Sequence, residues 1–471
     1  MEYIHAFILY TGETDKDTEQ TLLESGLVKR ITYLPSIRQA SSELVHNISQ
    51  QTDAGYILLV FEPIVPGMFA LERMLDIAVD TSAGMLYADY REESGDALNP
   101  HPLIDYRKGS LRDDFDFGPL HLYHAGAFKE AVATTDTNDY RFAGLYDLRL
   151  SISRQHPIVH VNEFLYIRKE IKDKAPDAAT QFDYVSPQNR DVQLEMERAC
   201  TAHLHKIGAF LTPRHKTINF REVDFDYEAS VIIPVRNRAS TITEAVTSVF
   251  SQETKFPFNV IVVDNHSTDG TGNILKNMAM NDDRLVYITP RRKDLGIGGC
   301  WNYGVNHPMC GRFAIQLDSD DVYGSRFTVQ NIVDAFYILQ CGMVIGSYTL
   351  TDFDMNTIPP GLVDHSEWTP ENGHNNALRI NGLGAPRAFY THLLRNIKLP
   401  NTSYGEDYAA GLRISREYSI GRIYESLYIC RRWEDNSDAS PSLEKINEHN
   451  AYKDNLRTWE LEARIKMNKT V

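Results

Sequence analysis

Short apolar runs in the second half of the chain predict the strands of a buried sheet. These runs are rich in β-branched residues, and they span residues 229–234, 260–264, 285–288 and 313–318. A helix with Ser240 or Thr241 as its N-cap is predicted after the first run, because apolar residues recur there at helical spacing. Strands that alternate with helices imply a parallel α/β sheet. In such sheets ligands bind beyond the carboxyl ends of the strands.

The first half of the chain shows the same alternation. Strands are predicted at residues 4–9, 56–61 and 84–90, and the segment 146–150 parallels the segment 406–413. Two interpretations stay open: a diverged internal duplication, or an unrelated α/β domain, because strand–helix alternation is common.

The 471 residues suggest two or three domains at roughly 100–200 residues each. We expect an N-terminal α/β domain, a helical connector, a second globular domain and a C-terminal helical tail. Their predicted bounds are 1–173, 174–227, 228–440 and 441–471.

Composition narrows the class of protein. Hydrophobic residues make up 42% and charged residues 24%, so the chain can bury a core. A net charge of −16 argues against nucleic acid as a partner, since that ligand requires a basic face. We expect no signal peptide and no membrane span, although peripheral membrane association stays open. The five cysteines show no metal or disulfide spacing, and together these features predict a cytoplasmic protein.

The most informative polar segment follows the run at 313–318. Asp318, Asp320 and Asp321 bring three carboxylates together, and like charges this close normally require a cation. Hard oxygen ligands suit Mg²⁺ or Mn²⁺, which would bridge to diphosphate oxygens. The alternative is an acidic turn exposed to solvent.

Two further acidic positions are candidates. Asp264 ends a predicted strand and could accept hydrogen bonds from a nucleoside, or it could form an Asx-turn with the residues that follow. Glu406 and Asp407 precede a helix, where acids are favourable, but one of them could be a general base.

Taken in order, these segments resemble family 2 glycosyltransferases of the GT-A fold, over residues 228–440. The motifs are Val231–Arg238, Val262–Thr271, Gly296–Gly304, Asp318-Ser319-Asp320 and Glu406-Asp407. The resemblance implies a GT-A nucleotide-diphospho-sugar transferase fold in the C-terminal half. The preceding α/β domain lacks the full motif series, so a degenerate GT-A-like domain there would not be a working enzyme.

The resemblance also implies roles for single residues. Asp407, beside Glu406, would be the catalytic base, and Asp320 with Asp318 would bind Mn²⁺ or Mg²⁺. The nucleotide sugar would contact Pro234, Arg236, Asn237, Asp264, Ser267, Gly298, Asn302, Asp318 and Ser319.

Two further segments bear on metal and donor binding. Trp433 stands where many family members have a metal-binding His, and indole cannot bind a metal, so Arg432 or Arg431 could hold the diphosphate instead. Gly382 and Gly384 allow close backbone approach to the donor sugar, or they form an ordinary turn into a helix that starts near Arg387.

We therefore expect a metal-dependent, inverting glycosyltransferase that acts in polysaccharide or glycoconjugate synthesis. The donor would be a nucleotide-diphosphate sugar, with a UDP-sugar as the default, and the acceptor a glycan or a lipid-linked glycan. The alternative of another class is an inactive module that binds a sugar nucleotide or a glycan. A nucleotidyltransferase is disfavoured, because neither 1–11 nor 230–238 has a glycine-rich, basic phosphate loop.

Overall fold

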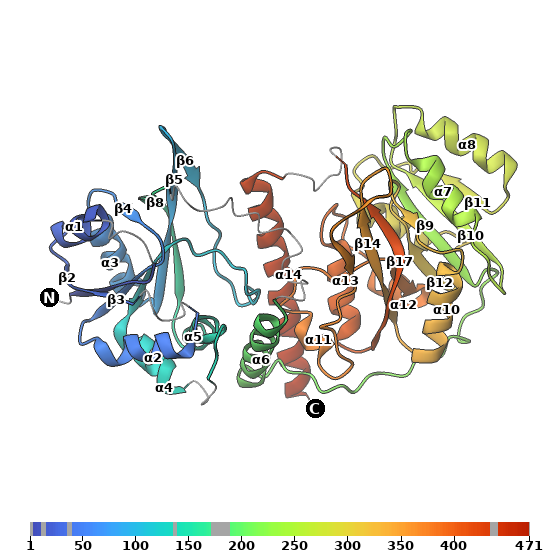
Figure 1. The fold of residues 1–471 in the computed structure, drawn as a ribbon. Helices are drawn as coiled ribbons and strands as arrows, with labels where there is room; N and C mark the ends of the chain where they lie inside the picture. Colours follow the sequence, from blue (N-terminus) through green and yellow to red (C-terminus); the bar gives the residue numbers. More distant parts are fainter. Residues whose placement is uncertain are drawn as a thin grey trace. The chain divides into compact units, whose positions relative to one another are not determined.

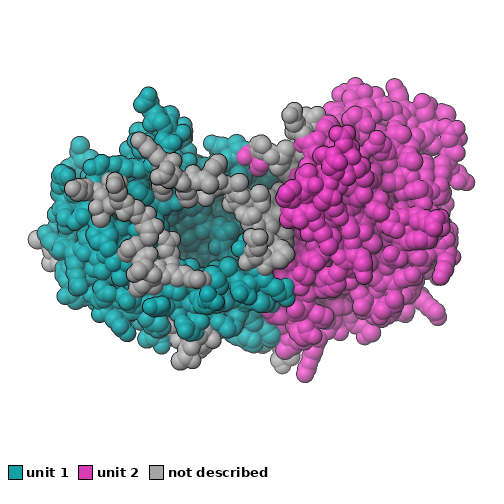
Figure 2. Space-filling view, viewed as in Figure 1, with its two compact units in different colours: residues 1–210, 442–471 teal, residues 211–441 magenta. Residues whose placement is uncertain are grey.

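The computed structural model describes residues 3–10, 16–34, 40–134, 139–170, 189–433 and 441–470. The chain forms two compact units (Figures 1 and 2): unit 1 comprises residues 1–210 with 442–471, and unit 2 comprises residues 211–441. Part of the predicted connector, 174–188, lies outside the described residues, as does 434–440 of the predicted second domain. The four-part division of the chain stays a prediction.

Unit 2 is built on a nine-stranded sheet of order β11-β10-β9-β12-β16-β14-β17-β13, with β15 paired to β14. Its strands are β9 (Ala229–Val235), β10 (Phe258–Asp264), β11 (Leu285–Ile288), β12 (Phe313–Gln316), β13 (Val322–Tyr323), β14 (Met343–Thr351), β15 (Thr357–Val363), β16 (Arg387–Tyr390) and β17 (Ile420–Arg431). The four strands predicted for this half are therefore present. Three of them, β9, β10 and β12, are apolar runs buried from end to end or nearly so, whereas only Leu285 is fully buried in β11.

The helices of unit 2 connect these strands (Figure 1). They are α7 (Ile242–Phe250), α8 (Thr271–Asn281), α9 (Ile297–Val305), α10 (Thr328–Leu339), α11 (Gly373–Asn376), α12 (Thr391–Ile397) and α13 (Glu406–Ser415). Thr241 is the N-cap residue of α7, but its hydroxyl donates to the Ser319 carbonyl at 2.9 Å instead of capping the helix. The helix start thus contributes to the loop that carries the predicted metal motif.

Two expectations about this half were wrong. The sheet is mixed: β11, β10, β9 and β12 run parallel, whereas β16 is antiparallel to both β12 and β14. The segment from Arg387 is strand β16, and the next helix starts only at Thr391. Both differences have one cause, which is the pairing of Arg387–Tyr390 with distant strands. Local periodicity leaves the conformation of this four-residue segment ambiguous, so its state and direction depend on that pairing.

Unit 1 has an eight-stranded sheet of order β2-β1-β3-β7-β5-β8-β4, with β6 paired to β5. Its strands are β1 (Ile4–Ile8), β2 (Val28–Tyr33), β3 (Tyr56–Val60), β4 (Ile64–Pro66), β5 (Met85–Ser94), β6 (Ala97–His101), β7 (Leu120–His124) and β8 (Ile158–Arg168). Its helices are α1 (Lys16–Glu24), α2 (Ser42–Gln51), α3 (Ala70–Thr81), α4 (Ala125–Thr134), α5 (Gly144–Ile152), α6 (Arg190–Lys206) and α14 (Leu443–Lys469). None of the described helices is both long enough and apolar enough to cross a membrane.

The two sheets have the same topology. Apart from β11, the strands of unit 2 correspond one to one, in chain order, with the strands of unit 1. Corresponding strands have the same neighbours in the sheet and run in the same relative directions. The register also agrees: Met85 lies beside Tyr123 and Ile158, as Met343 lies beside Phe389 and Ile420. This agreement favours an internal duplication over an unrelated domain, and it confirms the α/β class for both halves.

Candidate active site

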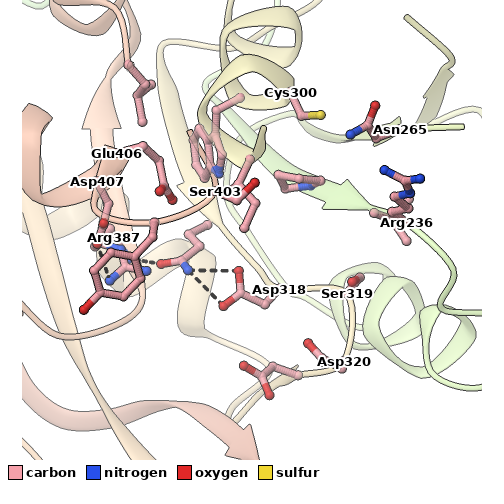
Figure 3. A pocket seen from close by; sticks show the side chains of 18 of the residues that line it. Arg236, Asn265, Cys300, Asp318, Ser319, Asp320, Arg387, Ser403, Glu406 and Asp407 are labelled. Carbon is pink, nitrogen blue, oxygen red and sulfur yellow. Dashed lines mark hydrogen bonds and ion pairs between the residues drawn. The ribbon is translucent and has the colours of Figure 1, made fainter. Parts of the chain in front are cut away.

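A cavity of about 530 Å³ opens in unit 2 beyond the carboxyl ends of β9, β10 and β12 (Figure 3). Its volume lies in the range typical of small-molecule sites, roughly 300–1,000 Å³. The wall combines five carboxylates with four guanidinium groups and several apolar side chains. The charged residues are Asp318, Asp320, Asp321, Glu406, Asp407, Arg236, Arg238, Arg387 and Arg432.

The acidic loop between β12 and β13 is fixed by contacts from distant strands. Gln316 donates from Nε2 to both oxygens of Asp318, at 3.0 and 3.1 Å, and the Asp318 amide donates to the Tyr428 hydroxyl. Asp321 accepts the Arg431 amide at 2.8 Å, and the Arg431 Nε donates to the Asp320 carbonyl. Asp321 and Arg431 therefore hold the loop, and Asp318 and Asp320 line the cavity.

Burial gives this loop unusual acid–base properties. Loss of solvent raises the pKa of Asp318, although the Arg387 charge opposes the shift. Burial also raises the pKa of Asp321 well above its usual range, and the charges of Asp318 and Asp320 add to that effect. Carboxylates in such surroundings are stabilised by a cation or a proton.

The acidic pair begins helix α13 on the other side of the cavity. Asp407 forms an ion pair with Arg387, with 2.7 Å between Oδ2 and the guanidinium nitrogen (Figure 3). Its other oxygen, Oδ1, has no hydrogen-bond partner among the described residues. Glu406 is 8% exposed, and its Oε2 is buried without such a partner. Burial, together with the Asp407 charge, raises the pKa of Glu406 to about 8, so this carboxyl keeps its proton at neutral pH.

Arg387 is the main site residue that sequence reasoning missed. It lies at the start of β16, and its amide donates to Gln316 Oε1 at 3.1 Å. Gln316 in turn contacts Asp318, so one chain of contacts joins the acidic loop, Gln316, Arg387 and Asp407 (Figure 3). A lone arginine after a Gly-Ala-Pro turn carries no sequence signal for this role, because the contacts cross between strands.

Other predicted residues support the site from behind its wall. Asp264 accepts the Ser267 amide at 2.9 Å and the Tyr287 hydroxyl at 2.8 Å. The Asn237 amide donates to the Ser267 hydroxyl. These contacts agree with the Asx-turn interpretation of Asp264. Asp264, Ser267 and Asn237 all lie in the loops that flank the cavity.

The glycine-and-asparagine segment positions the loop before α13. A Cβ at Gly298 would overlap the carbonyl oxygen of Pro400, so only glycine fits there. Asn302 exchanges two hydrogen bonds with Leu399, donating to its carbonyl at 2.8 Å and accepting its amide at 3.0 Å. Leu399 lines the cavity, so this segment acts from behind the wall by holding Leu399 in place.

The remaining candidates fall into two groups. Gly384 has a φ of +98°, and its carbonyl accepts a hydrogen bond from Arg387, so this turn orients the arginine. Gly382, like Asn237, Asp264, Ser267, Gly298, Asn302 and Gly384, is not part of the cavity wall. The predicted residues on the wall are Pro234, Arg236, Asp318, Ser319, Asp320, Glu406, Asp407 and Arg432. The role of each of these residues stays a prediction.

The residues present fit a divalent cation of the Mg²⁺ type. Among the described residues, no group of three His, Cys, Asp or Glu side chains is arranged to hold a metal on its own. Mg²⁺ usually binds through one or two carboxylates, with phosphate oxygens and water as further ligands. Asp318 and Asp320 on the cavity wall supply such a set. Trp433 packs against Phe353 and adds no ligand.

Residues 230–397 match the family model described as glycosyl transferase family 2. Unit 2 therefore carries a glycosyl transferase family 2 domain, and the resemblance drawn from the motifs is confirmed.

Curated relatives also bear glycosyltransferase names. An uncharacterized glycosyltransferase of Rickettsia felis is 28% identical over 44% of this chain and 35% of its own length. The UDP-Glc:alpha-D-GlcNAc-diphosphoundecaprenol beta-1,3-glucosyltransferase WfgD of Escherichia coli is 25% identical over 50% of this chain and 85% of its own length. The chain spans about half or less of the first relatives that it matches.

Among solved structures, TarS of S. aureus in complex with UDP-GlcNAc is similar to this chain. The identity is 21% over 50% of this chain and 72% of that one, with a TM-score of 0.39.

Proposed function

We propose that the chain is an inverting, metal-dependent glycosyltransferase that moves a sugar from a nucleotide diphosphate to an acceptor hydroxyl. The observation that carries this proposal is the unit 2 cavity, which places Asp318 and Asp320 on one wall and Glu406 and Asp407 on another. The family 2 match over residues 230–397 supports the reaction class.

Asp407 is the base in this proposal. Arg387 holds Oδ2 in an ion pair, which leaves Oδ1 to accept the proton of an acceptor hydroxyl. Glu406 is less suited to that role, because its raised pKa of about 8 keeps the carboxyl protonated at neutral pH. The deprotonated hydroxyl then attacks the anomeric carbon on the face opposite the nucleotide, which inverts the configuration at that carbon.

The negative charge of the departing diphosphate requires compensation. Asp318 and Asp320 would hold Mn²⁺ or Mg²⁺, which supplies a Lewis acid for the phosphate oxygens when it is bound. Arg236, Arg238 and Arg432 line the same cavity and add positive charge. Arg238 lies 3.4 Å from Asp320, so it orients this carboxylate as well.

The donor and the acceptor are proposed by analogy. The E. coli relative is named for UDP-glucose and for an acceptor on diphosphoundecaprenol, and another relative from Bacillus subtilis is named for minor teichoic acid biosynthesis. We propose a UDP-sugar as donor and a lipid-linked or polymeric glycan as acceptor, in the cytoplasm.

The testing experiment measures release of the nucleotide from a panel of UDP-, GDP- and dTDP-sugars, with and without manganese. We expect slow release from one donor, lost with a chelator and in Asp320→Ala. Tight, manganese-dependent binding of one donor without release, even after glycan acceptors are added, would support an inactive binding module instead. Neither release nor binding of any donor would refute the proposal.

A further inference from the structure

Unit 1 contains a pocket that overlaps in part with the position of the unit 2 cavity, when the two units are aligned. When the two sheets are aligned by their register, Tyr123 corresponds to Phe389, and each of these residues lines the pocket of its own unit. Helix α5 shares the pattern Leu-Arg-Leu-Ser with Leu-Arg-Ile-Ser of α13. On this alignment Phe142 stands where unit 2 has Glu406, and it lines the unit 1 pocket.

The unit 1 pocket has the size and lining of a site for one ring. Its volume is about 170 Å³, and an apolar cavity of about 150 Å³ holds a benzene ring. Aromatic side chains make up much of the wall: Phe115, Phe117, Tyr123, Phe142 and Tyr146. Aromatic faces suit the C–H faces of a sugar ring, because they bury apolar surface beside polar edges.

The wall also contains a buried cation. Arg149 is 5% exposed, and its guanidinium lies over the rings of Tyr146 and Phe117, at 4.7 and 5.3 Å from their centroids. It donates to the Arg112 carbonyl, but its Nε has no hydrogen-bond partner in the part of the chain that the structure describes. Among the described residues, no carboxylate lies within ion-pair distance of this guanidinium.

The matching arginine of unit 2 is in a different situation. Arg413 aligns with Arg149, lies at 39% side-chain exposure and pairs with Glu417 at 2.8 Å. A buried guanidinium without a counter-ion is costly unless a ligand supplies the charge. Two polar residues on the same wall are compatible with such a ligand: Asp113 can accept sugar hydroxyls, and burial lowers the pKa of His121 to about 4, so the imidazole is neutral.

We propose that the unit 1 pocket binds one sugar ring that carries a negatively charged group, a carboxylate or a phosphate. The aromatic side chains contact the ring, and Arg149 neutralises the anion through its free Nε. Unit 1 would thus be a glycan-binding unit that has kept the position of an ancestral sugar site and exchanged its chemistry. This proposal stands independently of transfer activity in unit 2.

The experiment is calorimetry on the full chain, with the unit 2 cavity saturated by UDP and manganese. The probes are glucuronate, glucose 1-phosphate and neutral glucose. We expect one of the two anionic sugars to bind to a single site, about tenfold or more tightly than glucose. Glucuronate alone would identify a carboxylate ligand, and glucose 1-phosphate alone a phosphate ligand.

Two variants locate the site. Arg149→Met should weaken the anionic probe by about tenfold or more, whereas the matched Arg413→Met in unit 2 should leave its binding unchanged. If Arg149→Met does not fold, Leu145→Trp serves instead: Leu145 is half-buried and lines the pocket, so the larger ring fills it and should abolish binding. The proposal is overturned if no anionic sugar binds, if glucose binds equally well, or if folded Arg149→Met or Leu145→Trp binds as the wild type does.

Discussion

Units 1 and 2 each have a sheet of the same topology, but the two sheets carry different sites. The same strand order, directions and register recur in both, while the polar residues at the carboxyl edge differ. After β12 unit 2 has Asp318-Ser319-Asp320, and after the matching β3 unit 1 has Phe61-Glu62-Pro63. The comparison shows that the scaffold does not determine the chemistry, which depends on a few side chains placed on it.

The exchanges in unit 1 follow one direction. Phe142 and Ala143 stand where unit 2 has Glu406 and Asp407, and the register places His121 where unit 2 has Arg387. Each exchange removes a permanent charge or an acid. The unit 2 cavity is consequently lined by several charged groups, whereas the unit 1 pocket is mainly aromatic and contains the buried Arg149.

The largest effect that would sharpen this comparison is expected for Asp407→Asn. The amide cannot accept the acceptor proton, so kcat should fall by roughly 10³-fold, a typical contribution of a general base. Donor binding should persist, because the side chain keeps its shape. Single-turnover kinetics with the donor identified by the hydrolysis panel measures both quantities, and unchanged kcat would remove Asp407 from the mechanism.

A smaller loss is expected for Arg387→Gln. Without the guanidinium, Asp407 loses its 2.7 Å ion pair and Asp318 loses a nearby opposing charge, so kcat should fall by roughly 10²-fold. Arg387→Lys keeps the charge and should restore part of the activity. If the glutamine and lysine variants match the wild type in kcat and KM, the contact chain between the two walls has no functional role.

The third prediction concerns the pH dependence of stability at Glu406. Its pKa is about 8 in the folded protein and near 4.5 in the unfolded chain, so folded-state stability declines as pH rises through that window. Glu406→Gln lacks this titration. In the presence of a chelator, the variant should therefore gain on the wild type between pH 5 and pH 8, by about 1–3 kcal/mol, a few degrees in Tm. A constant difference in Tm across that range would contradict the raised pKa.

The smallest effect is expected in unit 1. Glu62 follows β3 as the acidic loop follows β12, and it pairs with Arg168 at 3.4 Å near the surface. Glu62→Gln should leave turnover unchanged within about twofold and cost less than about 1 kcal/mol. A large loss of turnover in this variant would break the comparison, because it would give unit 1 a catalytic role.

Local patterns along the chain were enough to predict several strands and the family. The apolar runs predicted four of the nine unit 2 strands, and the ordered motifs identified the family, because short strands and strand-end acids leave signals within a few residues. The same signals could not fix strand direction. They also misassigned the segment from Arg387, since four residues carry too little periodicity to separate strand from helix.

Only the tertiary structure decided which polar residues meet. Arg431 reaches the acidic loop from 110 positions away, and Arg387 at the start of strand β16 pairs with Asp407 on helix α13. Burial, which raises the pKa of Glu406 and leaves the Arg149 Nε without a hydrogen-bond partner among the described residues, is likewise a property of packing. Sequence specifies which groups are present and where strands form, whereas solvent exclusion and long-range pairing determine the charge and partner of each group.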